Sequence, residues 1–168
     1  ILDIGTGSGL IALMLAQRSS AMIDAIDLDA GAVRQAEINV AASDWNNRIM
    51  VRHQSLQDFA NKFRSTYDLI VSNPPYFMSS LKAPDEARTR ARHTDTLTHD
   101  ELLKSALGLL KKTGRICVIL PVNEGLQCMK SAQNFSLYCY QCVYVHPKPN
   151  VEAKRVLLEF GLNDRTTK

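Results

Sequence analysis

The sequence predicts an α/β domain with a mostly parallel sheet and helices on both of its faces. Three observations lead to this fold class. Short apolar runs typical of buried strands alternate with helix-forming stretches, the first run leads directly into a glycine-rich turn, and 45% of the 168 residues are hydrophobic, which is ample for a continuous core. Strands that alternate with helices are joined by right-handed crossovers, so we expect neighbouring strands to run parallel.

The N-terminal half of the chain contains four predicted strands. The first, Ile1–Ile4, is followed by the turn Gly5-Thr6-Gly7-Ser8-Gly9 and by the strongly helix-forming run at 10–17. Asp29 precedes the second helix in a position typical of an N-cap. The other predicted elements of this half are a strand at 22–27, a helix at 30–42, a strand at 49–53, a short helix at 57–63 and a strand at 67–71.

The C-terminal half continues the pattern and ends on two strands. An amphipathic helix is predicted at 100–112, ended by Gly114, and a strand at 115–120 and a helix at 123–133 follow it. Two apolar runs, at 138–145 and 155–162, then form a terminal strand pair. Because the chain begins without Met and inside a strand, we expect residues 1–168 to be one domain of a longer protein, without its natural N-terminus.

Composition and charge exclude several classes of protein. No apolar run approaches the ~20 residues that span a membrane, and no signal-peptide pattern is present, so we expect a cytoplasmic protein with no membrane partner. The net charge of +3 permits a nucleic-acid partner without requiring one. Cys139 and Cys142 form one C-x-x-C pair in a predicted strand, where residues three apart face opposite sides. We therefore expect reduced thiols and no metal.

The glycine turn is the first candidate binding site. Its glycines let a ligand lie against the backbone, and its N–H groups favour a polar or anionic ligand end. The spacing G-x-G-x-G is one residue shorter than the dinucleotide pattern, so a pyrophosphate is not the expected ligand. Asp27 ends the second strand eighteen residues after Gly9, close to the ~20 at which a carboxylate meets ribose hydroxyls. Asp29 is the competing candidate for that role.

The stretch Ser72-Asn73-Pro74-Pro75-Tyr76-Phe77 follows the fourth strand at its carboxyl end, where open α/β sheets build their active sites. Two adjacent prolines fix φ and keep the preceding residue extended, so the Asn73 side chain and the Pro74 carbonyl would be held in a nearly rigid frame. Two such acceptors suit a single NH2 group. The alternative is a proline turn that only ends the strand.

Together these motifs resemble those of a known family. The chain resembles Rossmann-like S-adenosylmethionine-dependent methyltransferases that modify planar NH2 groups. The resemblance lies in the glycine turn with Asp3, in Asp27, and in Asn73-Pro74-Pro75-Tyr76. This resemblance implies a seven-stranded, mostly parallel sheet with an antiparallel strand near one edge, and S-adenosylmethionine as cofactor. The chain looks most like the bacterial tRNA1(Val) adenine-37 N6-methyltransferase family, on the strength of Val71–Phe77 and of later runs at 91–97, 145–148 and 155–160.

The resemblance also implies roles for individual residues. The catalytic motif would be Asn73, Pro74, Pro75 and Tyr76, with Tyr76 stacked on the base. Where the family shows an acidic residue for the adenine of the cofactor, this chain has Ser55, and Asp58 or a backbone carbonyl could take over that contact. The full set implied for cofactor binding is Asp3, Gly5, Thr6, Gly7, Gly9, Asp27, Leu28, Ser55, Leu56 and Asn73.

Two basic groups are candidates for contact with a substrate. Tyr76 and Phe77 lead into a long polar loop at 78–98, a length that is usually functional or disordered. Within it, Arg88, Arg90 and Arg92 cluster beside the proposed site, although a solvated loop with its own ion pairs is an equal alternative. The second group joins the last two strands and would face either phosphates or water; it comprises His146, Lys148, Lys154 and Arg155.

Three functions are compatible with the sequence. The first is methylation of the N6 amine of an adenine in RNA, with tRNA as partner and tRNA1(Val) adenine 37 as the expected target. The second is N5-methylation of a glutamine in a translation release factor, because an amide presents the same two N–H donors to the Asn73 motif. The third is a subunit that binds S-adenosylmethionine or RNA without catalysis. Phe77 and the arginines favour nucleic acid, and the oligomeric state is left open.

Overall fold

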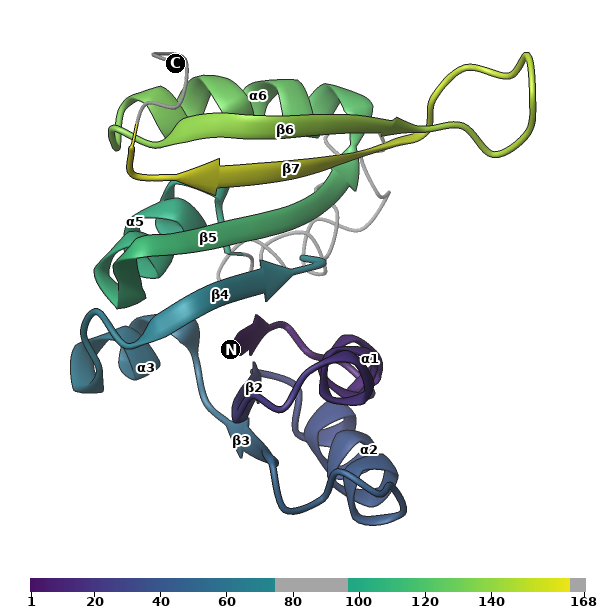
Figure 1. Ribbon diagram of the computed structural model, residues 1–168, viewed down its shortest axis with the longest axis vertical. Coiled ribbons are helices and arrows are strands. Elements are labelled where there is room, and N and C mark those ends of the chain that lie inside the picture. The colour runs from purple at the N-terminus through teal and green to yellow at the C-terminus, as the bar shows by residue number, and fades with distance from the viewer. Residues whose placement is uncertain (75–96, 164–168) are drawn as a thin grey trace, which may run out of the picture.

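Residues 1–74 and 97–163, which the computed structural model describes, form a seven-stranded sheet with helices on both faces (Figure 1). The strand order is β3-β2-β1-β4-β5-β7-β6. Within these ranges no helix is long and apolar enough to cross a membrane. The strands are β1 (Leu2–Ile4), β2 (Ile23–Asp27), β3 (Ile49–His53), β4 (Tyr67–Ser72), β5 (Leu110–Pro121), β6 (Tyr138–Val145) and β7 (Arg155–Gly161), and the helices are α1 (Leu10–Arg18), α2 (Ala30–Ala41), α3 (Leu56–Lys62), α5 (His99–Leu109) and α6 (Val122–Gln133).

The direction of the strands confirms the predicted fold class. Strands β1 to β5 pair in parallel, whereas β7 lies antiparallel between β5 and β6. The parallel strands therefore all end at one edge of the sheet, which we call the carboxyl edge. Ile4, Asp27 and Ser72 are the last residues of β1, β2 and β4 at this edge. Motifs that are far apart in the sequence thus meet at the point where a ligand is expected.

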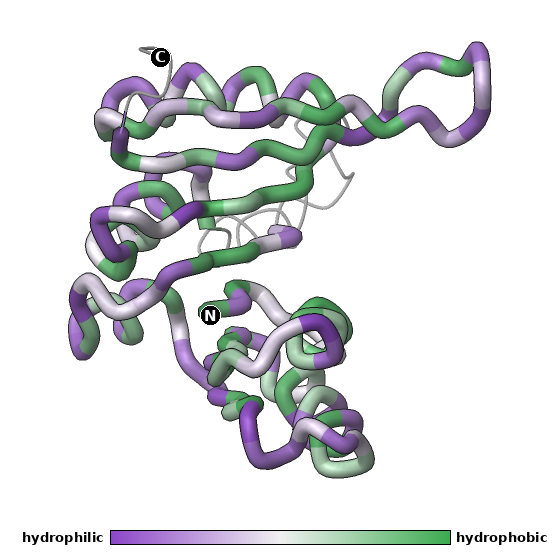
Figure 2. The backbone as a smooth tube through the Cα atoms, viewed as in Figure 1, coloured by the Kyte–Doolittle hydropathy of each residue, from purple (hydrophilic) through white to green (hydrophobic). Residues whose placement is uncertain are grey.

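Two hydrophobic clusters cover the two faces of the sheet. One joins α3, α5 and α6 to the central strands and contains Phe59, Leu103, Leu109 and Phe160, each fully buried. The other packs α1 and α2 against β2 and β3, with alanines such as Ala12 that let the helices lie close to the strands. Figure 1 shows these helix groups on opposite sides, and Figure 2 shows hydrophobic residues concentrated along the central strands.

Helix α5 ends earlier than the sequence predicts. The predicted helix runs to residue 112, but the structure ends it at Leu109 and begins β5 at Leu110, which pairs with Tyr67. The register then shifts, so that Leu69 pairs with Arg115. A side chain on Gly114 would come within 2.9 Å of the Tyr67 carbonyl oxygen, so this glycine serves a close strand approach and does not end the helix. Burial of Leu110 in the core outweighs the helix preference of the lysines that follow.

A β-bulge in β6 overturns the prediction that Cys139 and Cys142 face opposite sides. Cys139 lies opposite Phe160 and Cys142 lies opposite Leu158, with the register shift between them. Phe160 and Leu158 both belong to the cluster under α5 and α6, so the two cysteines face the same side. The extra residue of the bulge changes the alternation of side chains. All four thiols are free, and the residues described contain no group of three His, Cys, Asp or Glu side chains suited to a metal ion.

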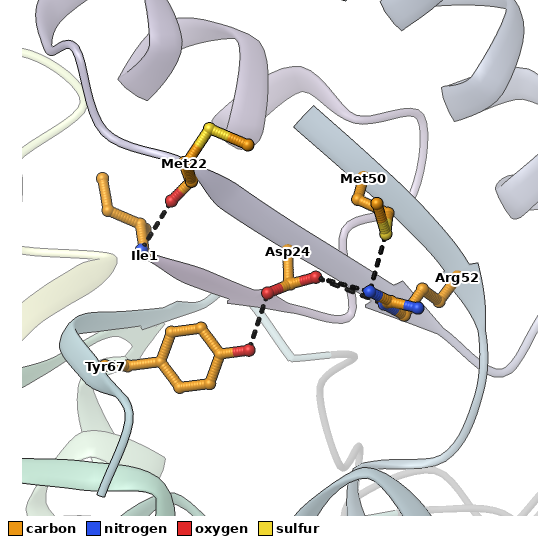
Figure 3. Close-up of polar contacts among 6 residues, drawn as sticks. All are labelled: Ile1, Met22, Asp24, Met50, Arg52 and Tyr67. Atoms are coloured by element: carbon orange, nitrogen blue, oxygen red, sulfur yellow. Dashed lines mark hydrogen bonds and ion pairs between the residues drawn. The ribbon is translucent and has the colours of Figure 1, made fainter. Parts of the chain in front are cut away.

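Asp24 ties three strands together near the amino ends of β2 and β4 (Figure 3). Its carboxylate accepts hydrogen bonds from the Arg52 guanidinium at 3.2 Å and from the Tyr67 hydroxyl at 2.7 Å. Burial, together with the hydrogen bond to Asp24, raises the pKa of Tyr67, so the phenol stays a proton donor. Asp24 and Tyr67 lie near the amino ends of their strands, and the Arg52 side chain reaches them from near the carboxyl end of β3. The cluster therefore links β2, β3 and β4 and stabilises the sheet.

Gly125 is the position where α6 crosses β7, and we expect Gly125→Ala to destabilise the fold. An added methyl group would overlap the Val156 side chain, and overpacking of a close contact costs about 1 to 3 kcal/mol. Gly108→Ala in α5 is the matched control, because only the Arg64 guanidinium lies within 4 Å of the added carbon, at 3.9 Å. Urea denaturation should show a loss for Gly125→Ala and no loss for the control. Equal unfolding midpoints would refute the proposed packing constraint.

Candidate active site

The glycine turn forms an open cradle at the end of β1. Gly5 and Gly7 have φ angles of +68° and +56°, which residues with a side chain rarely adopt. No atom lies within 4 Å of the place where either side chain would begin, so a ligand has access to the backbone there. At the third glycine, Gly9, an added side chain would begin 3.3 Å from the Ala36 side chain, so this glycine lets α2 pack against the turn. The structure thus separates two ligand-accessible glycines from one that serves packing.

The Asp27 side chain links the glycine turn to the end of β2 through hydrogen bonds. Its carboxylate accepts a hydrogen bond from the Gly7 N–H at 2.8 Å and another from the Asp29 N–H at 2.9 Å. Each carboxylate oxygen keeps further acceptor capacity for a ligand hydroxyl. Asp29, in turn, accepts from the Ala32 N–H at 2.7 Å and caps α2, which confirms its predicted structural role. Both carboxylates line the same cleft.

The cleft has a volume of about 670 Å³, within the usual range for small-molecule sites. It lies along the carboxyl edge, between the ends of β1, β2 and β4 and the starts of α3 and α5. Predicted site residues from four separate segments of the chain meet in it. They are Gly5, Asp27, Leu28, Ser55, Leu56, Asn73 and Pro74.

Four predicted cofactor-binding residues do not line the cleft: Thr6, Gly7, Gly9 and Asp3. Among them, Asp3 is the charged one. Its side chain is fully buried, and one carboxylate oxygen accepts the Thr6 hydroxyl at 2.6 Å. The other oxygen is buried with no hydrogen-bond partner of standard geometry among the described residues. Burial raises the pKa of Asp3 to about 6, against the opposing effects of the Thr6 hydroxyl and the Ala12 N–H. A buried acceptor beside the glycine turn suits a cationic ligand group.

The raised pKa of Asp3 predicts a specific dependence of stability on pH. A folded pKa above the unfolded value means that the stabilisation is present below pH 3.8 and is lost as pH rises through about 6. The free energy of unfolding of Asp3→Asn relative to the natural chain should therefore increase by about 2 kcal/mol between about pH 4.5 and 7. Parallel denaturation series of both chains measure this difference. A difference that stays constant with pH would mean that Asp3 has an ordinary pKa.

Ser55 caps α3 and is already engaged with Asp58. The Ser55 hydroxyl accepts from the Asp58 N–H at 3.0 Å and donates to the Asp58 carboxylate at 2.7 Å. Ser55 and Leu56 line the cleft, whereas Asp58 lines a neighbouring hollow with His53. This hollow shares Leu28, Gln54 and Ser55 with the cleft, so the role of Asp58 as a substitute for the missing acidic residue stays a prediction. The contact to the adenine of the cofactor stays a prediction.

The acceptor motif begins at the end of β4, next to β1. The Ser72 hydroxyl donates to the Ile4 carbonyl at 2.9 Å and fixes the two strand ends together. Asn73 is exposed and Pro74 is buried, and both line the cleft. Pro75, Tyr76, Phe77, Arg88, Arg90 and Arg92 lie outside the described residues, so their roles stay predictions.

Several residues that line the cleft were not singled out by the sequence. Gln54 follows β3 at the carboxyl edge, and its N–H donates to the Asp27 carbonyl at 3.0 Å. Glu101 forms a capping box with Thr98 at the start of α5, and its carboxylate accepts from the Thr98 N–H at 2.9 Å. The Thr-x-x-Glu pattern is a visible helix-start signal. Its position beside the cleft follows only from how α5 packs. Gln57, Leu97 and Ala32 also line the cleft.

The fold and the cleft define a class of protein, and comparisons with known proteins agree. Residues 1–137 match the family model of the methyltransferase small domain. The fold is similar to that of a predicted O-methyltransferase from Agrobacterium tumefaciens, with a TM-score of 0.74, 16% identity, and coverage of 98% of this chain and 74% of that chain. It is also similar to a geranyl diphosphate C-methyltransferase from Streptomyces coelicolor, solved with S-adenosyl-L-homocysteine, with a TM-score of 0.68, 11% identity and coverage of 96% and 70%. This chain is a Rossmann-like methyltransferase, and S-adenosylmethionine is its methyl donor.

A curated relative identifies the family. The tRNA1(Val) (adenine(37)-N6)-methyltransferase of Parabacteroides distasonis is 48% identical over 161 residues, which cover 96% of this chain and 68% of that protein. The chain belongs to the tRNA1(Val) (adenine(37)-N6)-methyltransferase family. The family resemblance that the motifs predicted is therefore confirmed.

Proposed function

We propose that this chain methylates the N6 amine of an adenine in tRNA, adenine 37 of tRNA1(Val). The observation that carries the proposal is the meeting of Asn73 and Pro74 with Gly5 and Asp27 in one cleft. A methyl donor and an acceptor amine held there would be brought together by residues from three strand ends. The family membership and the name of the relative from Parabacteroides distasonis support the choice of substrate. We take residues 1–168 as one methyltransferase domain. A tRNA substrate supports a location in the cytoplasm.

The residues around the glycine turn fit S-adenosylmethionine. Gly5 and Gly7 leave open space beside the backbone, and Asp27 keeps acceptor capacity for the ribose hydroxyls. Asp3 keeps one buried carboxylate oxygen without a hydrogen bond of standard geometry, which suits the ammonium group at the amino-acid end. Leu28, Ser55 and Leu56 line the cleft beyond Asp27 and would border the adenine. Thr6 and Gly9 act through the shape of the turn.

Asn73 and Pro74 would position the acceptor. The exocyclic NH2 of adenine shares its lone pair with the ring and is a poor nucleophile, so its orientation decides the rate. The Asn73 side-chain oxygen and the Pro74 carbonyl would accept its two N–H groups, which become more acidic as nitrogen bonds to carbon. Tyr76 would stack on the base, and Pro75 would keep the frame stiff.

The chemistry needs little more from the protein. When bound, S-adenosylmethionine supplies a methyl group on a positively charged sulfur, which is already activated for transfer. Asn73 and Pro74 then need only hold the amine in line and stabilise the charge that develops on it. No general base is required before transfer, because the amine attacks through its own lone pair.

The decisive experiment uses labelled S-adenosylmethionine and two transcripts of tRNA1(Val) that differ only at position 37. We expect label in the transcript with adenine and none in the transcript with guanine at that position. A translation release factor with its glutamine substrate site is the third acceptor in the assay. Label in the release factor alone would overturn the proposal in favour of glutamine methylation.

A further inference from the structure

The connection between β6 and β7, residues 146–154, projects beyond the carboxyl edge (Figure 1). We call it the β6–β7 tip. Strand register relates it to the acceptor motif: Ser72 pairs with Val118 on β5, and Pro121, three residues further along, pairs with Arg155 on β7. With strands ~4.8 Å apart and ~3.3 Å of rise per residue, Arg155 lies about 10 Å to the side of Ser72 and about 10 Å beyond it. The tip therefore begins beside the candidate active site and extends outward from it.

The charge of the tip is carried by two exposed lysines. Lys148 and Lys154 are both exposed, and among the described residues neither ammonium group pairs with a carboxylate. Glu152 is the acidic residue between them, and Arg155 follows directly. Counting Lys148 and Lys154 against Glu152 gives 2 − 1 = +1 for residues 146–154 with histidine neutral. Figure 2 shows the tip as mainly hydrophilic.

The tip is ordered by its own sequence. Pro147 and Pro149 flank Lys148 and restrict φ on both sides of it. Asn150 has a φ angle of +63°, a left-handed turn conformation that asparagine tolerates. The His146 ring contacts the Val151 carbonyl at 2.7 Å, and the Val151 N–H donates to the Lys148 carbonyl at 3.3 Å. A turn that is already ordered loses little conformational entropy when it binds a partner, so its exposed lysines are available for binding at a low entropic cost.

We propose that the β6–β7 tip binds the phosphate backbone of the tRNA next to the nucleotide that is methylated. This inference rests on the proposed function, because it takes tRNA as the substrate. Exposed ammonium groups on a stiff turn bind phosphates as point charges, and phosphate contacts position an RNA without reading its sequence. A folded tRNA is far larger than the cleft, so phosphates next to the bound adenine must pass over neighbouring parts of the carboxyl edge. The tip lies there, and lysine is depleted in protein–protein interfaces, so two exposed lysines favour RNA over a protein partner.

The test compares two double variants of the intact protein that lose the same charge. The tip variant carries Lys148→Ala and Lys154→Ala. The opposite-edge variant carries Lys112→Ala, at the start of β5, and Lys130→Ala, in the last turn of α6; both of these lysines are exposed and lie at the edge of the sheet opposite the carboxyl edge. Binding of tRNA1(Val) is measured at several salt concentrations, with KM for tRNA, turnover and S-adenosylmethionine affinity. The variant Lys148→Arg with Lys154→Arg tests whether charge at these positions suffices.

Each phosphate contact to a single strand contributes about 0.7 to the slope of log affinity against log salt concentration. For the variant without the two tip lysines we therefore expect this slope to fall in magnitude by about 1.4, and tRNA affinity to fall about 25-fold at 0.1 M salt. KM should rise while turnover at saturating tRNA and cofactor affinity stay unchanged. The arginine variant should bind like the natural chain, as should the opposite-edge variant. If the protein methylates tRNA but the tip and opposite-edge variants show the same salt dependence of tRNA affinity, the proposal that the tip binds phosphates is wrong, while the proposed function stands. If the natural chain methylates no tRNA, the proposed function fails and the tip proposal with it.

Discussion

Replacement of Asn73 by alanine is expected to lower the turnover number for tRNA methylation by about 100-fold or more, with the affinity for S-adenosylmethionine nearly unchanged. The side chain would act on the acceptor amine, so its loss removes stabilisation that is made mainly in the transition state. The effect should therefore appear in kcat and only weakly in KM for tRNA. Steady-state kinetics with saturating cofactor measure both quantities.

Asn123→Ala is the matched control for this prediction. Asn123 is exposed near the start of α6, beyond the carboxyl end of β5, but does not line the cleft. Its replacement should leave turnover unchanged. Normal turnover in Asn73→Ala would remove Asn73 from the acceptor site. Loss of cofactor affinity in that variant would instead show that the end of β4 shapes the cofactor end of the cleft.

Replacement of Asp27 by alanine is expected to weaken S-adenosylmethionine binding by about 1.5 to 3 kcal/mol, which is about 10- to 150-fold. A carboxylate that accepts hydroxyl hydrogen bonds makes a charge-assisted contact, and Asp27 also holds the Gly7 and Asp29 N–H groups. Calorimetric titration measures the loss of affinity. Thermal denaturation in the absence of cofactor shows how much of it comes from a loosened turn.

Asp29→Ala separates the two acidic candidates. Asp29 caps α2, so its replacement should cost about 0.5 to 2 kcal/mol of stability and leave cofactor affinity nearly unchanged. The opposite pattern, with unchanged affinity in Asp27→Ala and lost affinity in Asp29→Ala, would assign the ribose contact to Asp29. Both carboxylates line the cleft, so only the measurement of affinity distinguishes them.

The sequence alone determined the fold class and the edge of the sheet where the site lies. Strand, glycine turn and helix follow one another within the first eighteen residues, and their signals are local. Parallel strands end at a common edge, so placing Asp27 and Asn73 after two such strands was enough to predict that they lie in one region. The N-cap at Asp29 was equally local, because the side chain and the N–H that it accepts are three residues apart.

Contacts between distant parts of the chain decided the rest. Leu110 belongs to a strand because Tyr67 pairs with it, and the two cysteines of β6 face one side because a bulge interrupts the pairing with β7. The packing of α5 brings Glu101 to the cleft, and the burial of Asp3 beneath the glycine turn raises its pKa. Residues near in sequence determine where a helix begins or a turn forms, whereas strand register, burial and the lining of a cleft depend on pairing energies that no local pattern contains.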